Sequence, residues 1–302
     1  MTKVFVDGSA GTTGLRIIDR LEARKDVTLL RLPEEKRKDV AMRKEAMNEA
    51  DVVFLCLPDD AAREAVSLIV NPKTAVIDTS TAHRTDPAWT YGFPELTGQR
   101  QKIEKSKRIA NPGCHASGFI SLVAPLTEAG ILSRSARLSC FSLTGYSGGG
   151  KKMIAEYESA DSGELLSAPR IYALGQTHKH LPEMQKVCGL IEAPAFCPIV
   201  APYYSGMEVT VPVFGLKPED LAKVYQDYYR SGMVRYSESN ENGFMSAGVF
   251  SGRDDMQIAV FGNESRAILV ARFDNLGKGA SGAAIQNMNL LLGLPDNTGL
   301  IG

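Results

Sequence analysis

Short apolar runs alternate with amphipathic stretches over the first third of the chain. The runs at residues 3–7, 27–32, 51–57 and 74–79 are apolar on both faces, which is typical of strands in a parallel sheet covered on both sides. Between the first two runs, Leu15, Ile18 and Leu21 share one helical face, and a charged helical pattern spans residues 59–69. Strands that alternate with helices predict an α/β, Rossmann-type parallel-sheet domain.

The pattern changes after about Pro112. Strand-like segments now follow one another with fewer helices between them, at residues 137–143, 195–201, 207–216, 256–261 and 266–274. The last two flank Gly262-Asn263-Glu264-Ser265, a good hairpin signal. Helical patterns span 218–231 and 279–292, with Gly293 as the stop of the second. This half predicts an α+β domain with a mainly antiparallel sheet.

Composition narrows the classes of protein. The 302 residues carry 34 Lys and Arg against 35 Asp and Glu, a net charge of −1, so a broad basic face for nucleic acid is not expected. With 44% hydrophobic residues the chain is not expected to be disordered, and no apolar run is long enough to cross a membrane. Five cysteines without CxxC spacing, and an N-terminus that begins as a strand, favour a reducing cytoplasm without disulfides or metal.

A glycine-rich turn joins the first predicted strand to the first predicted helix. Glycines at this place let a dinucleotide pyrophosphate approach the backbone, where the helix N-terminus offers free N–H groups. The spacing differs from the commoner GxGxxG, and a plain glycine-rich turn is the alternative. The predicted cofactor-binding residues of the turn are Gly8, Ser9, Ala10, Gly11, Thr12, Thr13 and Gly14.

The end of the second strand predicts which dinucleotide is bound. An NAD site usually has an acid there for the ribose 2′-hydroxyl, but this chain has Arg31, with Arg37 in the basic cluster that follows. Guanidinium groups suit a 2′-phosphate, so NADP(H) is favoured over NAD. A solvated charged loop is the alternative.

Asn111-Pro112-Gly113-Cys114 predicts a reactive thiol. The turn is followed by an apolar helical run, so Cys114 would begin a helix, where the dipole lowers a thiol pKa. A structural cysteine is the alternative. Cys56 and Cys140 lie inside apolar strands and are expected to be structural.

A thiolate nucleophile needs an acid/base partner. His115 is adjacent to Cys114 but points about 100° away from it on a helix, so it is a poor partner. His178 and His180 are better candidates, because Pro182-Glu183 predicts a helix start beside them and Glu183 can orient an imidazole. The two histidines could instead hold a metal, although no third ligand is apparent, or lie at the surface.

Two further segments predict contacts with anions. Thr79–Arg84 follows a parallel strand, where ligands gather; Ser80 is expected to contact the cofactor and Arg84 a substrate phosphate or carboxylate. A second glycine run opens another helix and would bind substrate through Ser147, Gly148 and Lys151, with Asn111 beside the nucleophile. An ordinary salt bridge and a flexible loop are the respective alternatives.

Taken together, the motifs resemble the shorter class of N-acetyl-gamma-glutamyl-phosphate reductases, related in fold to aspartate-semialdehyde dehydrogenases. The resemblance covers the whole chain and rests on the glycine turn, Tyr91–Leu96, Asn111–Cys114, His178–Glu183 and Asp274–Gly282. It implies an NADP-binding domain at 1–113 completed by a C-terminal helix at 279–302, and a catalytic, substrate and oligomerisation domain at 114–278. One departure is His115-Ala116-Ser117, where the family often has an aromatic residue, Pro and Thr.

The resemblance also implies the reaction. A small acyl phosphate would be reduced with NADPH in arginine biosynthesis, through a Cys114 thioester with His180 or His178 as acid/base and the nicotinamide near Asn275. A homo-oligomer, dimer or tetramer, is expected, with no nucleic acid or membrane partner. Two alternatives stay open: an aspartate-type enzyme on the same fold, and an NADP-binding redox sensor without turnover.

Overall fold

The chain folds into two compact units. The computed structural model describes residues 1–161 and 163–302. The first unit comprises residues 1–112 and 280–300, and the second comprises residues 113–279 with 301–302.

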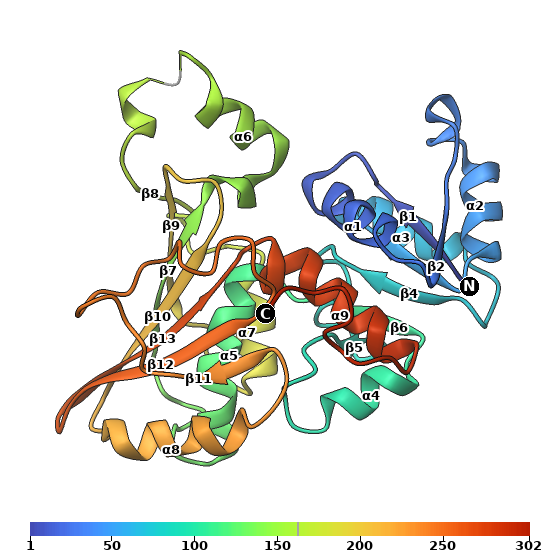
Figure 1. Cartoon of the computed structure of the whole chain (residues 1–302). Helices are drawn as coiled ribbons and strands as arrows, with labels where there is room; N and C mark the ends of the chain where they lie inside the picture. The colour runs from blue at the N-terminus through green and yellow to red at the C-terminus, as the bar shows by residue number, and fades with distance from the viewer. Residues whose placement is uncertain (162) are drawn as a thin grey trace. The chain divides into compact units, whose positions relative to one another are not determined.

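A six-stranded, all-parallel sheet organises the first unit, in the order β2-β1-β3-β4-β6-β5 (Figure 1). Its strands are β1 (Thr2–Asp7), β2 (Val27–Leu30), β3 (Val52–Leu55), β4 (Ala75–Asp78), β5 (Thr90–Tyr91) and β6 (Arg108–Ala110). Its helices are α1 (Thr12–Glu22), α2 (Val40–Glu49), α3 (Asp59–Leu68), α4 (Gln99–Lys105) and α9 (Gly282–Leu291). The sheet reverses its order around β1, where ligands of open α/β sheets bind at the carboxyl edge.

Both faces of this sheet are covered, as the doubly apolar strands predicted. Val4 and Val6 pack on the side of α1 and α9, while Phe5 between them packs on the side of α2 and α3. The same alternation continues along β3, with Phe54 on the first side and Leu55 on the second. Consecutive residues of each strand are therefore buried on opposite faces of the sheet.

The sequence patterns missed α2 and α4, and they overran the end of β2. The apolar residues of helix α2 do not gather on one face, and the helix begins where Asp39 accepts a hydrogen bond from the N–H of Met42. Strand β2 ends at Leu30, three residues before Pro33, rather than at Leu32. Short helices without a clear apolar face carry too weak a periodic signal to be predicted from one sequence.

A seven-stranded mixed sheet organises the second unit, in the order β11-β12-β13-β10-β7-β9-β8. Its strands are β7 (Ser139–Gly145), β8 (Arg170–Ile171), β9 (Ala195–Ala201), β10 (Met207–Phe214), β11 (Val234–Tyr236), β12 (Met256–Asn263) and β13 (Arg266–Phe273). Four neighbouring pairs are antiparallel, including the β12–β13 hairpin, and two are parallel. The predicted fold class is confirmed for both sheets.

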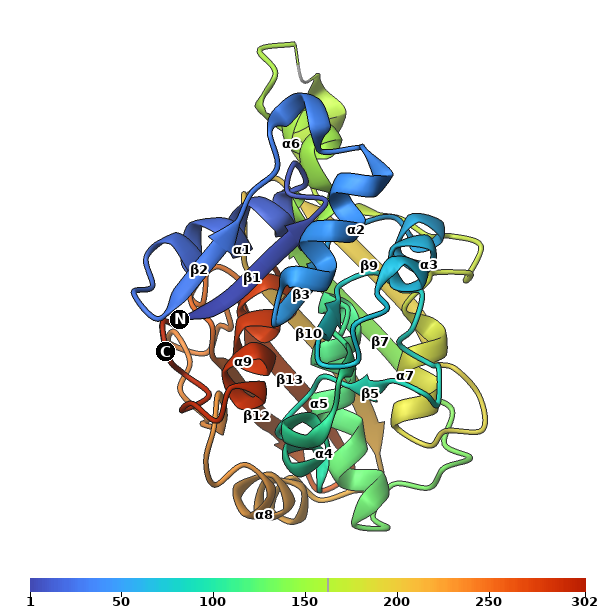
Figure 2. The ribbon, with the colours of Figure 1, turned by 90° about the vertical axis from the view of Figure 1, so that its right-hand side faces the viewer.

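Helices cover one face of this second sheet. They are α5 (Cys114–Glu128), α7 (Leu181–Val187) and α8 (Pro218–Tyr228), whereas α6 (Gly150–Glu158) packs against the turn at residues 146–149 that follows β7. Helix α5 lies across the strands with α8 beside it (Figure 2). A Cβ atom on Gly118 would lie 2.4 Å from Val209, so α5 sits close on β10 because this position is glycine. The tight packing fixes the start of α5, where Cys114 lies.

Candidate functional site

The glycine turn after β1 has a geometry that its first and third glycines make possible. Gly8 has a φ of +85°, and a Cβ atom there would lie 2.2 Å from the carbonyl oxygen of Cys56 at the end of β3. A Cβ atom on Gly14 would lie 2.7 Å from the carbonyl oxygen of Gly8. A side chain at either position would therefore push the turn away from the sheet.

Gly11 has a different part in the turn. It is the N-cap of α1, and a Cβ atom there would meet nothing closer than the Gly8 carbonyl oxygen at 3.7 Å. The open space lies at the N-terminus of α1, where backbone N–H groups and the helix dipole favour an anion. The residues therefore fit a dinucleotide pyrophosphate.

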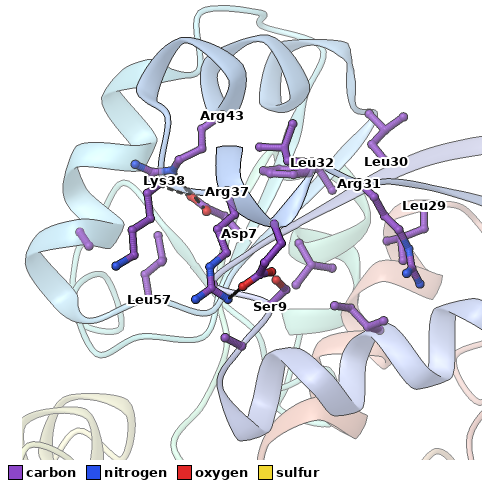
Figure 3. A pocket seen from close by; sticks show the side chains of 17 residues that line it. Asp7, Ser9, Leu29, Leu30, Arg31, Leu32, Arg37, Lys38, Arg43 and Leu57 are labelled. Atoms are coloured by element: carbon purple, nitrogen blue, oxygen red, sulfur yellow. Dashed lines mark hydrogen bonds and ion pairs between the residues drawn. The ribbon is translucent and has the colours of Figure 1, made fainter.

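A pocket of about 430 Å³ adjoins this turn (Figure 3). Its wall runs from Asp7 and Ser9 past the end of β2 to the segment that precedes α2. Arg37 and Lys38 extend on the side of Ser9 and Leu57. Arg31 also lines the pocket, but it turns toward α1 and forms an ion pair with Glu22. Arg37 forms its own ion pair with Glu34, at 2.8 Å.

A buried ion pair that the sequence did not predict closes one side of the pocket. Arg43 of α2 donates from Nη2 and Nε to the Asp7 carboxylate, at 2.8 Å and 3.2–3.3 Å. Both side chains are buried. The carboxylate at the end of β1 is thus neutralised, so it does not repel a phosphate in the pocket. The role of Arg43 could have been predicted only if helix α2, on which it lies, had been predicted first.

Ser80, Arg84 and Asn111 make hydrogen bonds inside the first unit. Ser80 donates its hydroxyl to Asp78 at 2.7 Å, and Arg84 donates to the carbonyl oxygens of Asn111 and Thr79 at 2.9 and 3.0 Å. The Asn111 side chain donates to the carbonyl oxygen of Ala280 at 3.1 Å. These bonds join the carboxyl ends of β4 and β6. The predicted contacts of the three residues with ligands stay predictions.

In the second unit, Cys114 is the first residue of α5 and is partly exposed. The N–H of Gly113, its N-cap, donates to the buried Glu183 carboxylate of α7 at 3.2 Å, which holds the two helix starts together. A Cβ atom on Gly279 would lie 2.9 Å from the Cβ of Cys114, so glycine is needed beside the thiol. No local sequence pattern signals this contact, because the two residues lie far apart along the chain.

The predicted histidines lie together, and a third joins them. The rings of His178 and His180 have centroids 4.7 Å apart, and the His115 ring lies 5.5 Å from the first and 5.6 Å from the second. His180 is the buried N-cap of α7, and its N–H donates to Nδ1 of His178 at 3.2 Å. This hydrogen bond orients the His178 ring and favours the tautomer with the proton on Nε2.

Ser147, Gly148 and Asn275 form a second group in the same unit. The Asn275 side chain donates to the Ser147 hydroxyl at 3.0 Å and accepts from the N–H of Gly206 at 3.0 Å. Gly148 lies next to it, since a Cβ atom there would be 3.4 Å from the same amide nitrogen. Lys151 is exposed in the first turn of α6.

The other cysteines differ from Cys114 in their surroundings. Cys140 and Cys188 are buried, and desolvation raises the pKa of both thiols. Burial also raises the pKa of Cys56 to about 12. These three thiols stay protonated near neutral pH and are poor nucleophiles.

Metal-ligand clusters and membrane-spanning helices are both absent from the described part of the chain. Nowhere in residues 1–161 and 163–302 do three or more His, Cys, Asp or Glu side chains gather as metal ligands would. None of the helices described has the length and apolar character needed to span a lipid bilayer.

Comparisons with known proteins agree with this division of the chain. Residues 3–106 match a family model described as "Semialdehyde dehydrogenase, NAD binding domain". Residues 114–275 match one described as "Semialdehyde dehydrogenase, dimerisation domain".

Solved structures share the fold. Aspartate semialdehyde dehydrogenase II of Vibrio cholerae superposes with a TM-score of 0.71 over 97% of this chain and 98% of the other, at 16% identity. The enzyme of Candida albicans, solved with NADP, has a TM-score of 0.68 over 97% of this chain and 98% of the other, also at 16% identity.

Curated relatives are much closer in sequence. An N-acetyl-gamma-glutamyl-phosphate reductase of Burkholderia cenocepacia is 44% identical over 96% of this chain and 97% of its own length. A relative named N-acetyl-gamma-glutamyl-phosphate reductase 2, of a Nostoc species, is 42% identical over 99% of both chains. The chain therefore belongs to the N-acetyl-gamma-glutamyl-phosphate reductase family.

Proposed function

We propose that this protein reduces N-acetyl-L-glutamyl 5-phosphate to N-acetyl-L-glutamate 5-semialdehyde and phosphate, with NADPH, in arginine biosynthesis. The observation that carries the proposal is Cys114 at the start of α5, in the unit that also holds the His178–His180 pair. Covalent acyl transfer needs a nucleophile and an acid/base group; a thiol at a helix N-terminus and an imidazole in the same unit can serve as these two.

The cofactor is assigned to the first unit. The backbone of the Gly8–Gly14 turn would hold the pyrophosphate at the N-terminus of α1. Arg37 and Lys38 are better placed than Arg31 for a 2′-phosphate, because Arg31 turns toward α1. NADPH held in this way would supply the hydride that reduces the acyl group.

The residues of the second unit carry out the acyl chemistry. The Cys114 thiolate attacks the carbonyl carbon of the acyl phosphate, a C–S bond forms, and the C–O bond to phosphate breaks. The thioester is easier to reduce than a carboxylate, because sulfur donates little electron density to the carbonyl. Backbone N–H groups at the start of α5 stabilise the oxyanion at each addition step.

His180 is the proposed acid/base, and His178 supports it. A proton must leave the thiol before attack and must be returned to Cys114 when the aldehyde is released. His180 is the better candidate because it is buried at the N-cap of α7, while Nδ1 of His178 accepts the His180 backbone N–H.

We infer that the protein acts as a homo-oligomer in the cytoplasm. One face of the second sheet carries exposed apolar side chains, among them Phe141, Phe214 and Ile268. Register places Phe141 opposite Thr210, and Pro212 opposite Ile268, so these side chains share one face across β7, β10 and β13. The match of residues 114–275 to a dimerisation domain supports pairing through this unit.

The test is the oxidation of NADPH, or the reverse reaction from semialdehyde and phosphate. We expect turnover with N-acetyl-glutamyl phosphate and at least about a hundredfold lower kcat/KM with aspartyl phosphate, a difference of the size that distinct side-chain contacts give. Faster turnover of aspartyl phosphate would assign the aspartate-type reaction instead. NADPH binding without turnover of either compound would indicate a sensor.

A further inference from the structure

His115 occupies the centre of a buried hydrogen-bonded chain that the reaction scheme leaves unused. Its Nδ1 lies 2.7 Å from the Ser142 hydroxyl of β7, and its Nε2 lies 2.7 Å from the Tyr172 hydroxyl. His115 and Ser142 are buried. The imidazole thus connects the first turn of α5 with a sheet strand on one side and with the segment after β8 on the other.

That segment is the one that carries the proposed acid/base. Tyr172 follows β8 directly, and its N–H donates to the carbonyl oxygen of Pro198 at 3.0 Å, which anchors the segment's start on β9. Its end is His180, the N-cap of α7. Phe196 of β9 packs edge-on against both His115 and His178, with centroids 5.3 and 5.1 Å apart.

We propose that His115 is a positioning residue: by joining Ser142 and Tyr172 it holds the segment that carries His178 and His180 against the start of α5. The inference rests on the proposed function, because the histidines that it positions are the proposed acid/base pair. His115 itself does not touch the reacting atoms. The residue is also the departure from the family pattern noted in the sequence.

The protonation states of His115 and Tyr172 support this assignment. Burial, with a smaller contribution from His178, lowers the pKa of His115 to about 3, so its ring is neutral at physiological pH. Burial raises the pKa of the Tyr172 phenol, which therefore keeps its proton. A neutral imidazole has one donor and one acceptor, so it can hydrogen-bond both hydroxyls at once, donating to one and accepting from the other.

The test uses two variants that remove different hydrogen bonds of the Ser142–His115–Tyr172 series. His115→Phe keeps a ring in place but loses both hydrogen bonds, and Tyr172→Phe loses one hydroxyl alone. The matched control is Tyr228→Phe, which removes a hydroxyl bonded to the exposed Glu128 at 3.0 Å. We expect kcat to fall about ten- to a hundredfold in both test variants with KM for the acyl phosphate changed less than about threefold, and neither value to change in the control.

A second readout needs no turnover. The rate of Cys114 alkylation by iodoacetamide, mapped by mass spectrometry, is followed against pH in each variant. We expect its midpoint to move by at least about half a pH unit in His115→Phe and Tyr172→Phe, since the imidazoles of the proposed acid/base pair lose their fixed places. An unmoved midpoint in both variants would overturn the positioning role, whether or not the wild-type protein reduces N-acetyl-glutamyl phosphate.

A double-variant cycle separates positioning from general destabilisation. His180→Asn should lower kcat by about two to four orders of magnitude, as expected for a lost acid/base. Adding His115→Phe to His180→Asn should then cost less than about threefold more, because the group that His115 positions is gone. A fully additive loss would show that His115 acts independently of His180, and the proposal would be abandoned. His178→Asn as the background tests in the same way whether the roles of the two histidines are exchanged.

Discussion

At the scale of single residues, the five thiols of this chain differ mainly in their surroundings. Cys114 is partly exposed at a helix start, whereas burial raises the pKa of Cys140 and Cys188. We expect Cys114→Ser to lose at least about nine-tenths of the wild-type rate, because an alcohol there lacks thiolate character. NADPH binding, followed by fluorescence, should persist. Cys197→Ser is the control and should keep its activity; retention of more than about a tenth of the rate in Cys114→Ser would remove the nucleophile assignment.

His115 also makes the fold sensitive to acid. Its folded pKa of about 3 lies below the ordinary 6.5, so as pH falls the unfolded chain takes up a proton that the folded chain does not. The free energy of unfolding should therefore decrease as pH falls through this window. For this group the loss is about 2 kcal/mol between about pH 6.5 and 4.5. Urea denaturation of the wild-type protein and His115→Phe at both pH values checks this: the variant should show a loss smaller by about that amount. Equal losses would contradict the prediction.

At the scale of elements, the segment between β2 and α2 carries the side chains that we propose distinguish NADPH from NADH. It contributes Arg37 and Lys38 to the pocket, and α2 supplies Arg43 to neutralise Asp7. We expect Arg37→Ala with Lys38→Ala to lower kcat/KM for NADPH by about ten- to a hundredfold and to leave NADH use nearly unchanged, because only NADPH has the 2′-phosphate. Arg31→Ala is the comparison and should have the smaller effect. An equal loss with both cofactors would mean that these side chains support the fold and not the phosphate.

At the scale of the whole molecule, the outer face of the second sheet predicts self-association. Phe141 and Ile268 are 45% and 42% exposed on that face. We expect Phe141→Lys with Ile268→Lys to shift the protein to a smaller species in sedimentation velocity, because two charges would be desolvated in the interface. Leu165→Lys, which changes an 83% exposed side chain elsewhere in the unit, should leave the oligomer intact. An unchanged oligomer in the double variant would place the interface elsewhere.

Elements with a strong local pattern could be predicted from the sequence. The predicted range for β9 agrees with the structure at both ends, and the β12–β13 hairpin and Gly293, with a φ of +69°, lie where expected. Helix α9 begins at Gly282 rather than Gly279, because the Asp274 carboxylate accepts the N–H of Leu276 and of Gly277, and a π-helical turn, wider than an α-helix, spans Gly277–Ser281 first. Such a capture depends on atoms that a periodic pattern does not describe.

The features of the candidate site also fall into those that local sequence predicts and those that depend on packing. Sequence alone determined the glycine turn, Cys114 at a helix start and the paired histidines, because each is a local signal in which neighbouring residues carry the chemistry. Only the tertiary structure joined Arg43 to Asp7, Gly279 to Cys114, and His115 to Tyr172. Each of these contacts links distant segments, and its existence depends on how helices pack on sheets and not on spacing along the chain. The physical reason is that local propensity sets the elements, while packing sets which side chains meet.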